Sequence, residues 1–247
     1  VEVVQEKCLN LPVSQFTEGL LGRQVQRVYN RGKWIFLELS RGGHLLLNLG
    51  MGADLFYYGP GQAWDAGRRV RFHLDDGSGF TCRFWWFGHT HYCDTAALSA
   101  HDQTASLGPL ALSPEMDRDR FGDLFQSGRG RLKAVLTDQK RISGIGNVYI
   151  QDPLFRARQH PMRQVRDLTE GDVDRLYEAT TYTLRYAYEK GGLAYEKDFY
   201  GRPGGFTTDD FLVAYREGKP CPECGAAITK IRTGSTASFI CPECQPE

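Results

Sequence analysis

The sequence predicts an α+β protein of several domains, with a β-rich N-terminal part, a helical middle and a C-terminal hairpin. Three observations support this fold class. Short β-rich runs between glycine breaks fill about residues 20–95, helical periodicity follows them, and two Cys-Pro-Glu-Cys knuckles lie near the end of the chain. We therefore expect three domains, formed by residues 1–104, 105–205 and 206–247.

The composition is ordinary for a globular protein. Of the 247 residues, 41% are hydrophobic and 24% are charged, so wholesale disorder is not expected. The 30 basic and 30 acidic residues cancel, so any signal for nucleic acid must come from local clusters. We see no run of about 18 apolar residues and no secretory signal, which favours a reducing, cytoplasmic setting for the seven cysteines.

The N-terminal domain is expected to begin with a helix and continue as strands. Apolar side chains in residues 1–10 fit one face of a short helix. The regular β-rich runs that follow predict a β-sandwich or barrel. Within them, Asp76-Gly77 is a hairpin signal, because this dipeptide favours a tight two-residue turn.

The middle of the chain carries helix signals. One helix is expected to start at the cap Ser113, which precedes a proline and an acidic residue. Another is expected to run from the cap Thr169 to the terminator Gly191-Gly192. Residues 192–220 are rich in Gly, Pro and Tyr and form a connection too long for an idle loop.

Residues 144–147, Gly-Ile-Gly-Asn, join two of the predicted helices. Two glycines before a helix let backbone amides approach an anion, and Asn147 can cap the helix and donate to a phosphate. Lys133, Lys140 and Arg141 supply positive charge nearby. The same stretch is also consistent with a tight interhelical turn and nothing more.

Four cysteines predict a structural zinc site. Cys221 and Cys224 form one C-x2-C pair, Cys241 and Cys244 the other, and the segment between them is expected to form two strands that turn at Gly234. Four thiolates complete a tetrahedron and leave no position for water, so such a site is structural. Two disulfides are one alternative, which the reducing setting disfavours. A redox C-x-x-C is the other, which the lack of a surrounding βαβ pattern disfavours.

Six segments, in their order along the chain, resemble the formamidopyrimidine-DNA glycosylase / endonuclease VIII family of base-excision repair enzymes. Any single piece is a weak signal, but the shared order spans nearly the whole chain. The segments are VEVV (1–4), RGKWIFLEL (31–39), LNLGMGADL (47–55), LGPLALSPE (107–115), LTDQKRISGIGNVYIQDPLFRARQHP (136–161) and the cysteine-bearing segment from residue 215 onward.

The resemblance implies a helix–two-turn–helix DNA-binding domain in the middle of the chain and a DNA-binding cleft between its halves. It implies a DNA glycosylase with AP lyase activity, which flips a damaged base out of the duplex, cleaves its N-glycosidic bond and then cuts the strand. One structural Zn2+ is expected. The expected partner is double-stranded DNA with a damaged base or abasic site, bound by a monomer without a membrane, in a bacterial cytoplasm near the nucleoid.

The family roles transfer to individual residues. Lys33 matches the lysine that contacts phosphate beside the lesion and assists the chemistry, although a lone strand lysine is usually just solvated. Met51 matches the methionine that fills the void left by the flipped base, although a methionine that fills a gap in the core fits the same pattern. Lys133 and Asn147 match positions that clamp the phosphate backbone. Residues 191–207 resemble the loop that closes over the flipped base.

The loop at Trp85-Trp86-Phe87 departs from the family in part. Phe87 matches, but Trp85 stands where we expect an arginine that pairs with the orphaned base. An indole can stack on a base, yet it lacks the fork that reads a base edge. The preference for the opposite base is therefore open, and core packing is the alternative role for the Trp pair.

Further departures concern the catalytic and clamping residues. The nucleophilic proline and its adjacent glutamate are expected upstream of Val1, because VEVV matches a point about five residues after that proline. Thr236 stands where the family has a phosphate-gripping arginine, and Arg232 is the candidate replacement. Asp152 stands where many members have a glutamate that steadies the N-terminus.

Two other functions remain open at this point. The first is a non-catalytic or weakly catalytic paralogue that binds damaged DNA but lacks the proline nucleophile. The second is a zinc module that acts on protein partners. Steep loss of DNA affinity with salt is expected of any phosphate-gripping protein and argues against the second alternative.

Overall fold

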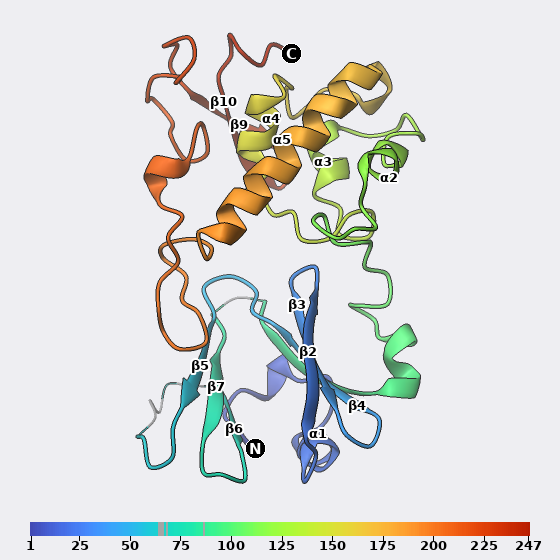
Figure 1. Ribbon diagram of the computed structural model, residues 1–247, viewed down its shortest axis with the longest axis vertical. Coiled ribbons are helices and arrows are strands. Elements are labelled where there is room, and N and C mark those ends of the chain that lie inside the picture. Colours follow the sequence, from blue (N-terminus) through green and yellow to red (C-terminus); the bar gives the residue numbers. More distant parts are fainter. Residues whose placement is uncertain (64–66, 68, 86) are drawn as a thin grey trace. The chain divides into compact units, whose positions relative to one another are not determined.

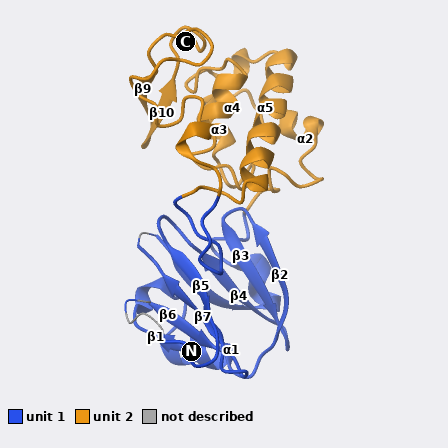
Figure 2. Ribbon diagram, turned by 60° about the vertical axis from the view of Figure 1, so that its left-hand side comes forward, with its two compact units in different colours: residues 1–106, 195–204 blue, residues 107–194, 205–247 orange. Residues whose placement is uncertain are grey.

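The computed structural model describes every residue of the chain except 64–66, 68 and 86. The chain forms two compact units, each built from two segments, which Figure 2 shows in different colours. Unit 1 comprises residues 1–106 and 195–204, and unit 2 comprises residues 107–194 and 205–247.

This division differs from the three expected domains. The expected boundary after residue 104 lies close to the end of the first segment of unit 1. The zinc hairpin, however, shares unit 2 with the helices, and residues 195–204 return to unit 1. Aromatic contacts explain that return, because Phe199 packs on Tyr57 and Phe80 with ring centroids 5.9 and 6.0 Å apart.

Unit 1 is a sandwich of two antiparallel sheets, as predicted (Figure 1). One sheet has the order β2-β3-β4-β8 and the other the order β1-β6-β7-β5. The strands are β1 (Glu2–Val3), β2 (Val25–Arg31), β3 (Trp34–Leu39), β4 (Gly43–Asn48), β5 (Asp54–Tyr58), β6 (Val70–His73), β7 (Gly79–Arg83) and β8 (His89–Asp94).

The core of unit 1 follows from the two-residue period of its strands. Leu37 and Leu45 from one sheet share a buried cluster with Phe72 and Phe80 from the other. The rings of Phe72 and Phe80 stack with centroids 4.4 Å apart. Side chains that alternate along a strand present one apolar face, and two such faces pack together with the polar faces outward.

The prediction of a helix at residues 1–10 is wrong. Glu2 and Val3 form β1, which pairs with β6, and residues 6–8 form only the 3-10 turn η1 (Glu6–Cys8). The first α-helix is α1 (Val13–Leu20), which begins after Pro12 and buries Phe16. The apolar residues at the start of the chain pack in the sheet and its core instead. The fixed φ of proline favours a helix that starts after Pro12. The hairpin at Asp76-Gly77 is confirmed, with Gly77 at φ +82° between β6 and β7.

Unit 2 contains the predicted helices and the predicted hairpin (Figure 1). No helix in the described part of the chain is both long and apolar enough to cross a membrane. The helices are α2 (Arg118–Asp123), α3 (Leu132–Leu136), α4 (Gln151–Arg156) and α5 (Glu170–Glu189), with the hairpin strands β9 (Thr229–Thr233) and β10 (Thr236–Ile240); the remaining 3-10 turns are η2 (Thr95–Ala100) in unit 1 and η3 (Val165–Asp167) and η4 (Thr208–Asp210) in unit 2.

The predicted limits of α5 are confirmed, whereas the predicted start of α2 is wrong. Thr169 caps α5 in a capping box, and Gly192 follows the helix at φ +85°. In α2 the cap is Asp117, whose Oδ1 accepts from the backbone N–H of Arg120 at 2.8 Å. Ser113 lies outside the helix, because its hydroxyl donates to a carbonyl three residues back at 2.9 Å.

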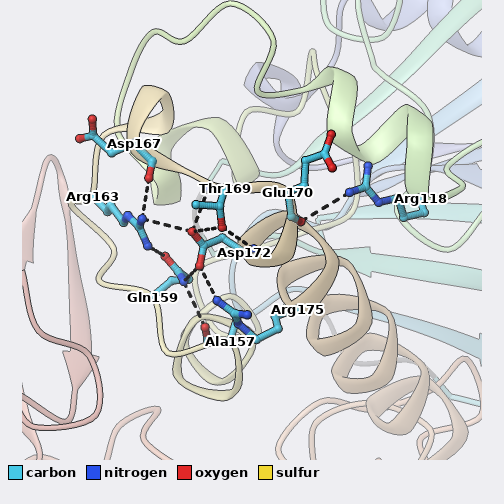
Figure 3. A network of polar contacts seen from close by, with 9 residues as sticks. All are labelled: Arg118, Ala157, Gln159, Arg163, Asp167, Thr169, Glu170, Asp172 and Arg175. Atoms are coloured by element: carbon cyan, nitrogen blue, oxygen red, sulfur yellow. Dashed lines mark hydrogen bonds and ion pairs between the residues drawn. The ribbon is translucent and has the colours of Figure 1, made fainter.

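A buried carboxylate ties α5 to the segment that follows α4 (Figure 3). Asp172 accepts from Gln159 Nε2 at 2.8 Å and forms ion pairs with Arg163 and Arg175. Burial raises the pKa of this carboxyl, but hydrogen bonds from Thr169 and the two guanidinium groups outweigh burial and leave the pKa lowered. This network fixes the first turn of α5 in unit 2.

A cluster of three histidines around Trp34 lies in unit 1, and we did not anticipate it from the residue pattern. His89 and His91 come from β8, and His101 follows η2. The Nδ1 atom of His91 lies 2.9 Å from Nε2 of His101, and all three imidazoles pack on the Trp34 ring within 6 Å between centroids. Burial, with smaller contributions from the neighbouring imidazoles, lowers the pKa of His91 to about 4.

This cluster should make unit 1 sensitive to acid. The folded state favours the neutral imidazole of His91, so the unfolded chain binds more protons once the pH falls below about 6.5. We expect the free energy of unfolding to decrease by about 2 kcal/mol between pH 7 and pH 4.5. Urea denaturation followed by tryptophan fluorescence measures it, because all four tryptophans fall within the first 86 residues.

The matched variants are His91→Phe and His73→Gln. His91→Phe removes the buried imidazole and should reduce the pH dependence, whereas His73→Gln changes an exposed histidine outside the cluster and should retain the part that His91 contributes. Equal loss of stability on acidification in the wild type and in His91→Phe would contradict the assignment.

Candidate nucleic-acid interface

The four knuckle cysteines converge at one end of the hairpin in unit 2. Their sulfur atoms all lie within 4.8 Å of one another, with 3.9 Å between Cys221 and Cys244 and 3.4 Å between Cys224 and Cys241. Gly234, at φ +66°, makes the turn between β9 and β10, as predicted. Four convergent thiolates suit one tetrahedral Zn2+, so the prediction of a structural zinc site is confirmed.

Lys133 connects α3 to the zinc hairpin. Its side chain is buried, and Nζ donates to the hydroxyls of Thr233, Thr236 and Ser238 at 2.8–3.0 Å and to the carbonyl of Ala237 at 2.9 Å. Burial lowers the pKa of the ammonium to about 8. This environment differs from the predicted contact with DNA phosphate, because an ammonium has three protons and hairpin oxygens already occupy them.

The glycine-asparagine turn lies beside the same hairpin, joined to it by Gln151. The Nε2 atom of Gln151 donates to the Asn147 carbonyl at 2.7 Å, and its Oε1 accepts from the backbone N–H of Phe239 in β10 at 3.2 Å. The turn and the finger therefore occupy one side of unit 2. Asn147 does not cap α4, however, because the helix begins only at Gln151 and residues 147–150 form a turn before it.

Arg232 and Thr236 lie at the end of the hairpin. Arg232 is exposed on β9, and its Nε donates to the Gly234 carbonyl at 3.3 Å. Thr236 is also exposed, and its hydroxyl accepts from Lys133. The guanidinium of Arg232 is thus placed at the hairpin turn, where it is available as the candidate replacement for the family arginine.

Asp152 has a role in unit 2 that the sequence did not reveal. Its buried carboxylate accepts from the backbone N–H groups of Leu212, Val213 and Ala214 at 3.0–3.2 Å. Burial raises the pKa of Asp152, although these hydrogen bonds oppose the rise. The carboxylate anchors the chain just before the first cysteine knuckle, about 60 positions away in sequence.

In unit 1, three predicted DNA-contacting side chains are strongly exposed. The exposed fraction is 62% for Met51, 61% for Trp85 and 76% for Phe87. These values contradict the core-packing alternatives for Met51 and Trp85. Trp86 lies outside the described residues. Lys33 is also exposed and lies in the turn between β2 and β3.

The Met51 loop packs against Trp85. Gly52 has φ +69°, and a Cβ at this position would lie 3.6 Å from Cδ1 of Trp85, so the backbone runs along the edge of the indole. The guanidinium of Arg83 lies over the Trp85 ring at 5.1 Å from its centroid and forms an ion pair with Asp54. Two loops that are distant in sequence thus present one exposed apolar surface.

Residues 195–204 bring an acidic side chain near Lys33 within unit 1. The backbone N–H of Tyr57 donates to the Phe199 carbonyl at 2.8 Å, which fixes this segment along β5. Burial raises the pKa of Glu196, and the positive charge of Lys33 opposes the rise. Our sequence reasoning missed Glu196, because only the folded chain brings it near a lysine more than 160 positions away.

Comparisons with protein families agree with this architecture. Residues 1–85 match the family model for the formamidopyrimidine-DNA glycosylase N-terminal domain, and residues 107–197 match that for the formamidopyrimidine-DNA glycosylase H2TH domain. Residues 218–246 match the zinc finger found in FPG and IleRS. The three matches follow the β-sandwich, the helices and the hairpin in order.

Individual relatives cover almost the whole chain. The formamidopyrimidine-DNA glycosylase of Roseiflexus sp. is 36% identical over 94% of this chain and 85% of its own length, and that of Pelotomaculum thermopropionicum is 32% identical over 99% and 90%. The crystal structure of the MutM (Fpg) protein from Thermus thermophilus superposes with a TM-score of 0.87 at 29% identity, covering 100% of this chain and 90% of that one. The chain belongs to the formamidopyrimidine-DNA glycosylase family.

A further solved structure shares the fold. The Lactococcus lactis Fpg, in a complex with DNA that contains an abasic site, superposes with a TM-score of 0.89 at 22% identity, covering 100% of this chain and 91% of that one. The predicted fold class is therefore confirmed by structures as well as by family models.

Proposed function

We propose that this protein is a base-excision DNA glycosylase with AP lyase activity. The observation that carries the proposal is the presence of three family parts in their expected order. These parts are an exposed Met51 loop on a β-sandwich, a glycine-asparagine turn and a four-cysteine hairpin beside that turn. Its partner is duplex DNA with a damaged base or an abasic site, bound by a monomer near the nucleoid of a bacterial cytoplasm.

The proposed chemistry starts with the flipped nucleotide. The nucleophile in this chemistry is the secondary amine of the family's N-terminal proline. It attacks C1′ of the sugar, and the bond from C1′ to the base breaks with a proton going to the departing base. Opening of the sugar ring gives an iminium ion between the proline nitrogen and C1′. Loss of a C2′ proton then expels the 3′ phosphate and cuts the strand.

The residues of this chain position the DNA for that step. Lys33 supplies a mobile positive charge beside the lesion phosphate, and Met51 fills the space of the flipped base. Arg232 and the amide groups near Asn147 grip the backbone on the side of unit 2. Lys133 attaches the hairpin to α3, because its ammonium donates hydrogen bonds to hairpin oxygens.

Borohydride trapping tests the activity directly. Protein with its natural N-terminus is incubated with a duplex that contains an abasic site, and borohydride reduces any iminium to a stable covalent adduct. We expect an adduct with this duplex and none with the undamaged one. Lys33→Ala should slow adduct formation by about 10- to 100-fold, because it removes a charge-assisted contact with the phosphate.

Lys7→Ala is the matched control, since Lys7 is an exposed lysine of the same unit outside the candidate site. Tight binding of abasic DNA without any adduct would instead support the non-catalytic damage binder. DNA affinity that does not fall with salt would favour a zinc module for protein partners.

A further inference from the structure

The strongest unexplained feature of unit 1 is the orientation of Trp85. One face of its indole is covered by the guanidinium of Arg83, which is itself held by the Asp54 carboxylate. The edge of its pyrrole ring rests on the backbone at Gly52. With these two contacts in place the side chain is still 61% exposed, so most of its surface remains available to a ligand.

These contacts pre-organise an aromatic surface. A tryptophan with free rotamers loses conformational freedom when it binds a ligand, whereas one held by a cation–π contact and a backbone edge has already lost much of it. Met51, whose side chain is 62% exposed, directly precedes Gly52 in the loop that the ring contacts. An exposed apolar side chain and a flat aromatic surface on which a base can stack therefore belong to two loops that touch at Gly52.

The chemistry of this surface identifies its ligand. When a base is flipped out of a duplex, the base opposite loses its partner and exposes its own face and edge. Stacking on an aromatic ring stabilises any such base, because all four have a π face. The indole has a single N–H donor and no acceptor, so it cannot form the paired hydrogen bonds that distinguish base edges.

We propose that Trp85 stacks on the base left unpaired opposite the lesion, and that the protein consequently accepts all four opposite bases with similar affinity. This inference rests on the proposed function, because only a flipped nucleotide leaves such a base. Stacking on Trp85 then determines how the protein treats the base opposite the lesion. Arg83 and Gly52 are the positioning residues for the ring.

Equilibrium binding to four duplexes tests this inference. Each duplex carries a tetrahydrofuran abasic analogue, which cannot form an iminium, opposite A, C, G or T, and affinity is measured by fluorescence anisotropy at fixed salt. We expect the four dissociation constants of the wild type to agree within about threefold. Trp85→Ala should raise all four by about 5- to 150-fold. Trp85→Arg should introduce a spread of about tenfold or more between bases, since an arginine fork reads base edges.

A 2-aminopurine opposite the analogue gives a local signal. Its fluorescence should be quenched on binding to the wild type and remain high with Trp85→Ala at saturating protein. Tyr188→Ala is the matched control, because Tyr188 is an aromatic residue with 79% exposure on α5 of unit 2. It should change neither the affinities nor the quenching.

Two outcomes would overturn the inference: a wild type that already prefers one opposite base by more than about tenfold, or unchanged affinity in Trp85→Ala. Either result leaves the proposed function intact if borohydride trapping still gives the adduct. Quenching by Trp85 without any trapped adduct would support the stacking site and contradict the proposed lyase activity.

Discussion

Loss of zinc should unfold the β9–β10 hairpin and abolish tight binding to duplex DNA. A two-stranded hairpin is marginal in water, and structural zinc contributes about 10–16 kcal/mol of apparent binding free energy in finger peptides at neutral pH. Cys241 is fully buried at the metal site, so Cys241→Ser replaces a thiolate ligand at the centre of that site with a hydroxyl, a poorer zinc ligand. We expect less than one zinc per chain by atomic emission and a loss of DNA affinity of at least about 100-fold.

The helices of unit 2 should survive this substitution. Their core, with Phe121, Leu132 and Leu176, forms a cluster separate from the one that Phe239 of the hairpin enters. Helical circular dichroism is therefore expected to remain. Cys93→Ser is the matched control, because Cys93 is a buried cysteine of unit 1 and this variant should keep one zinc per chain. Zinc-free Cys241→Ser protein with undiminished DNA affinity would disprove the role of the finger.

Local signals in the sequence were enough for several of the elements. The hairpin follows from the cysteine spacing and from Gly234, and both ends of α5 follow from Thr169 and the glycines at 191–192. Each of these signals acts within a few residues, through a metal ligand, a cap or a positive φ. Such elements can be predicted from the sequence because the cause and its effect lie this close together.

Competition with tertiary structure explains the errors. Helix-like spacing in residues 1–10 was overridden because Val3 gains a sheet partner in Val70, and a β ladder uses the same apolar residues in a different way. Ser113 is a favourable cap residue, but α2 begins after Asp117, whose charged side chain caps the helix. Both positions carry favourable cap residues, and packing of the core decides between them.

The roles given to the candidate site residues stay predictions, and the structure adds their environments. Met51, Trp85 and Lys33 are exposed, which is compatible with contacts to DNA. The surroundings of Lys133 could not be inferred, because its hydrogen-bond acceptors lie about 100 positions later in the chain. The histidine cluster around Trp34 was likewise invisible, since a sheet and a separate turn bring its members together.

Lys133→Met should destabilise the attachment of the hairpin to the helices. The substitution keeps much of the length of the side chain but removes the ammonium, which donates to the Ala237 carbonyl and three hydroxyls. Gln151 Nε2 still donates to the Ala237 carbonyl at 3.4 Å. Thr233 and Ser238 can still bond to each other, which recovers part of the loss. Hydrogen bonds to a charged group contribute about 1.5–3 kcal/mol each, but the cost of burying the ammonium, which lowers its pKa, offsets much of their sum. We therefore expect the free energy of unfolding of unit 2 to fall by about 3 kcal/mol.

The pH dependence separates this role from simple packing. The pKa of Lys133 is about 8 in the folded state and 10.5 for an ordinary lysine, so between these values the unfolded chain binds more protons. The stability of the wild type relative to Lys133→Met should therefore increase as the pH rises from about 8 to about 10. Lys140→Met is the control, because exposed Lys140 should show neither the loss nor the trend. A stability gap that stays constant over this range would mean that the buried amine does not titrate there, and would contradict the lowered pKa of Lys133.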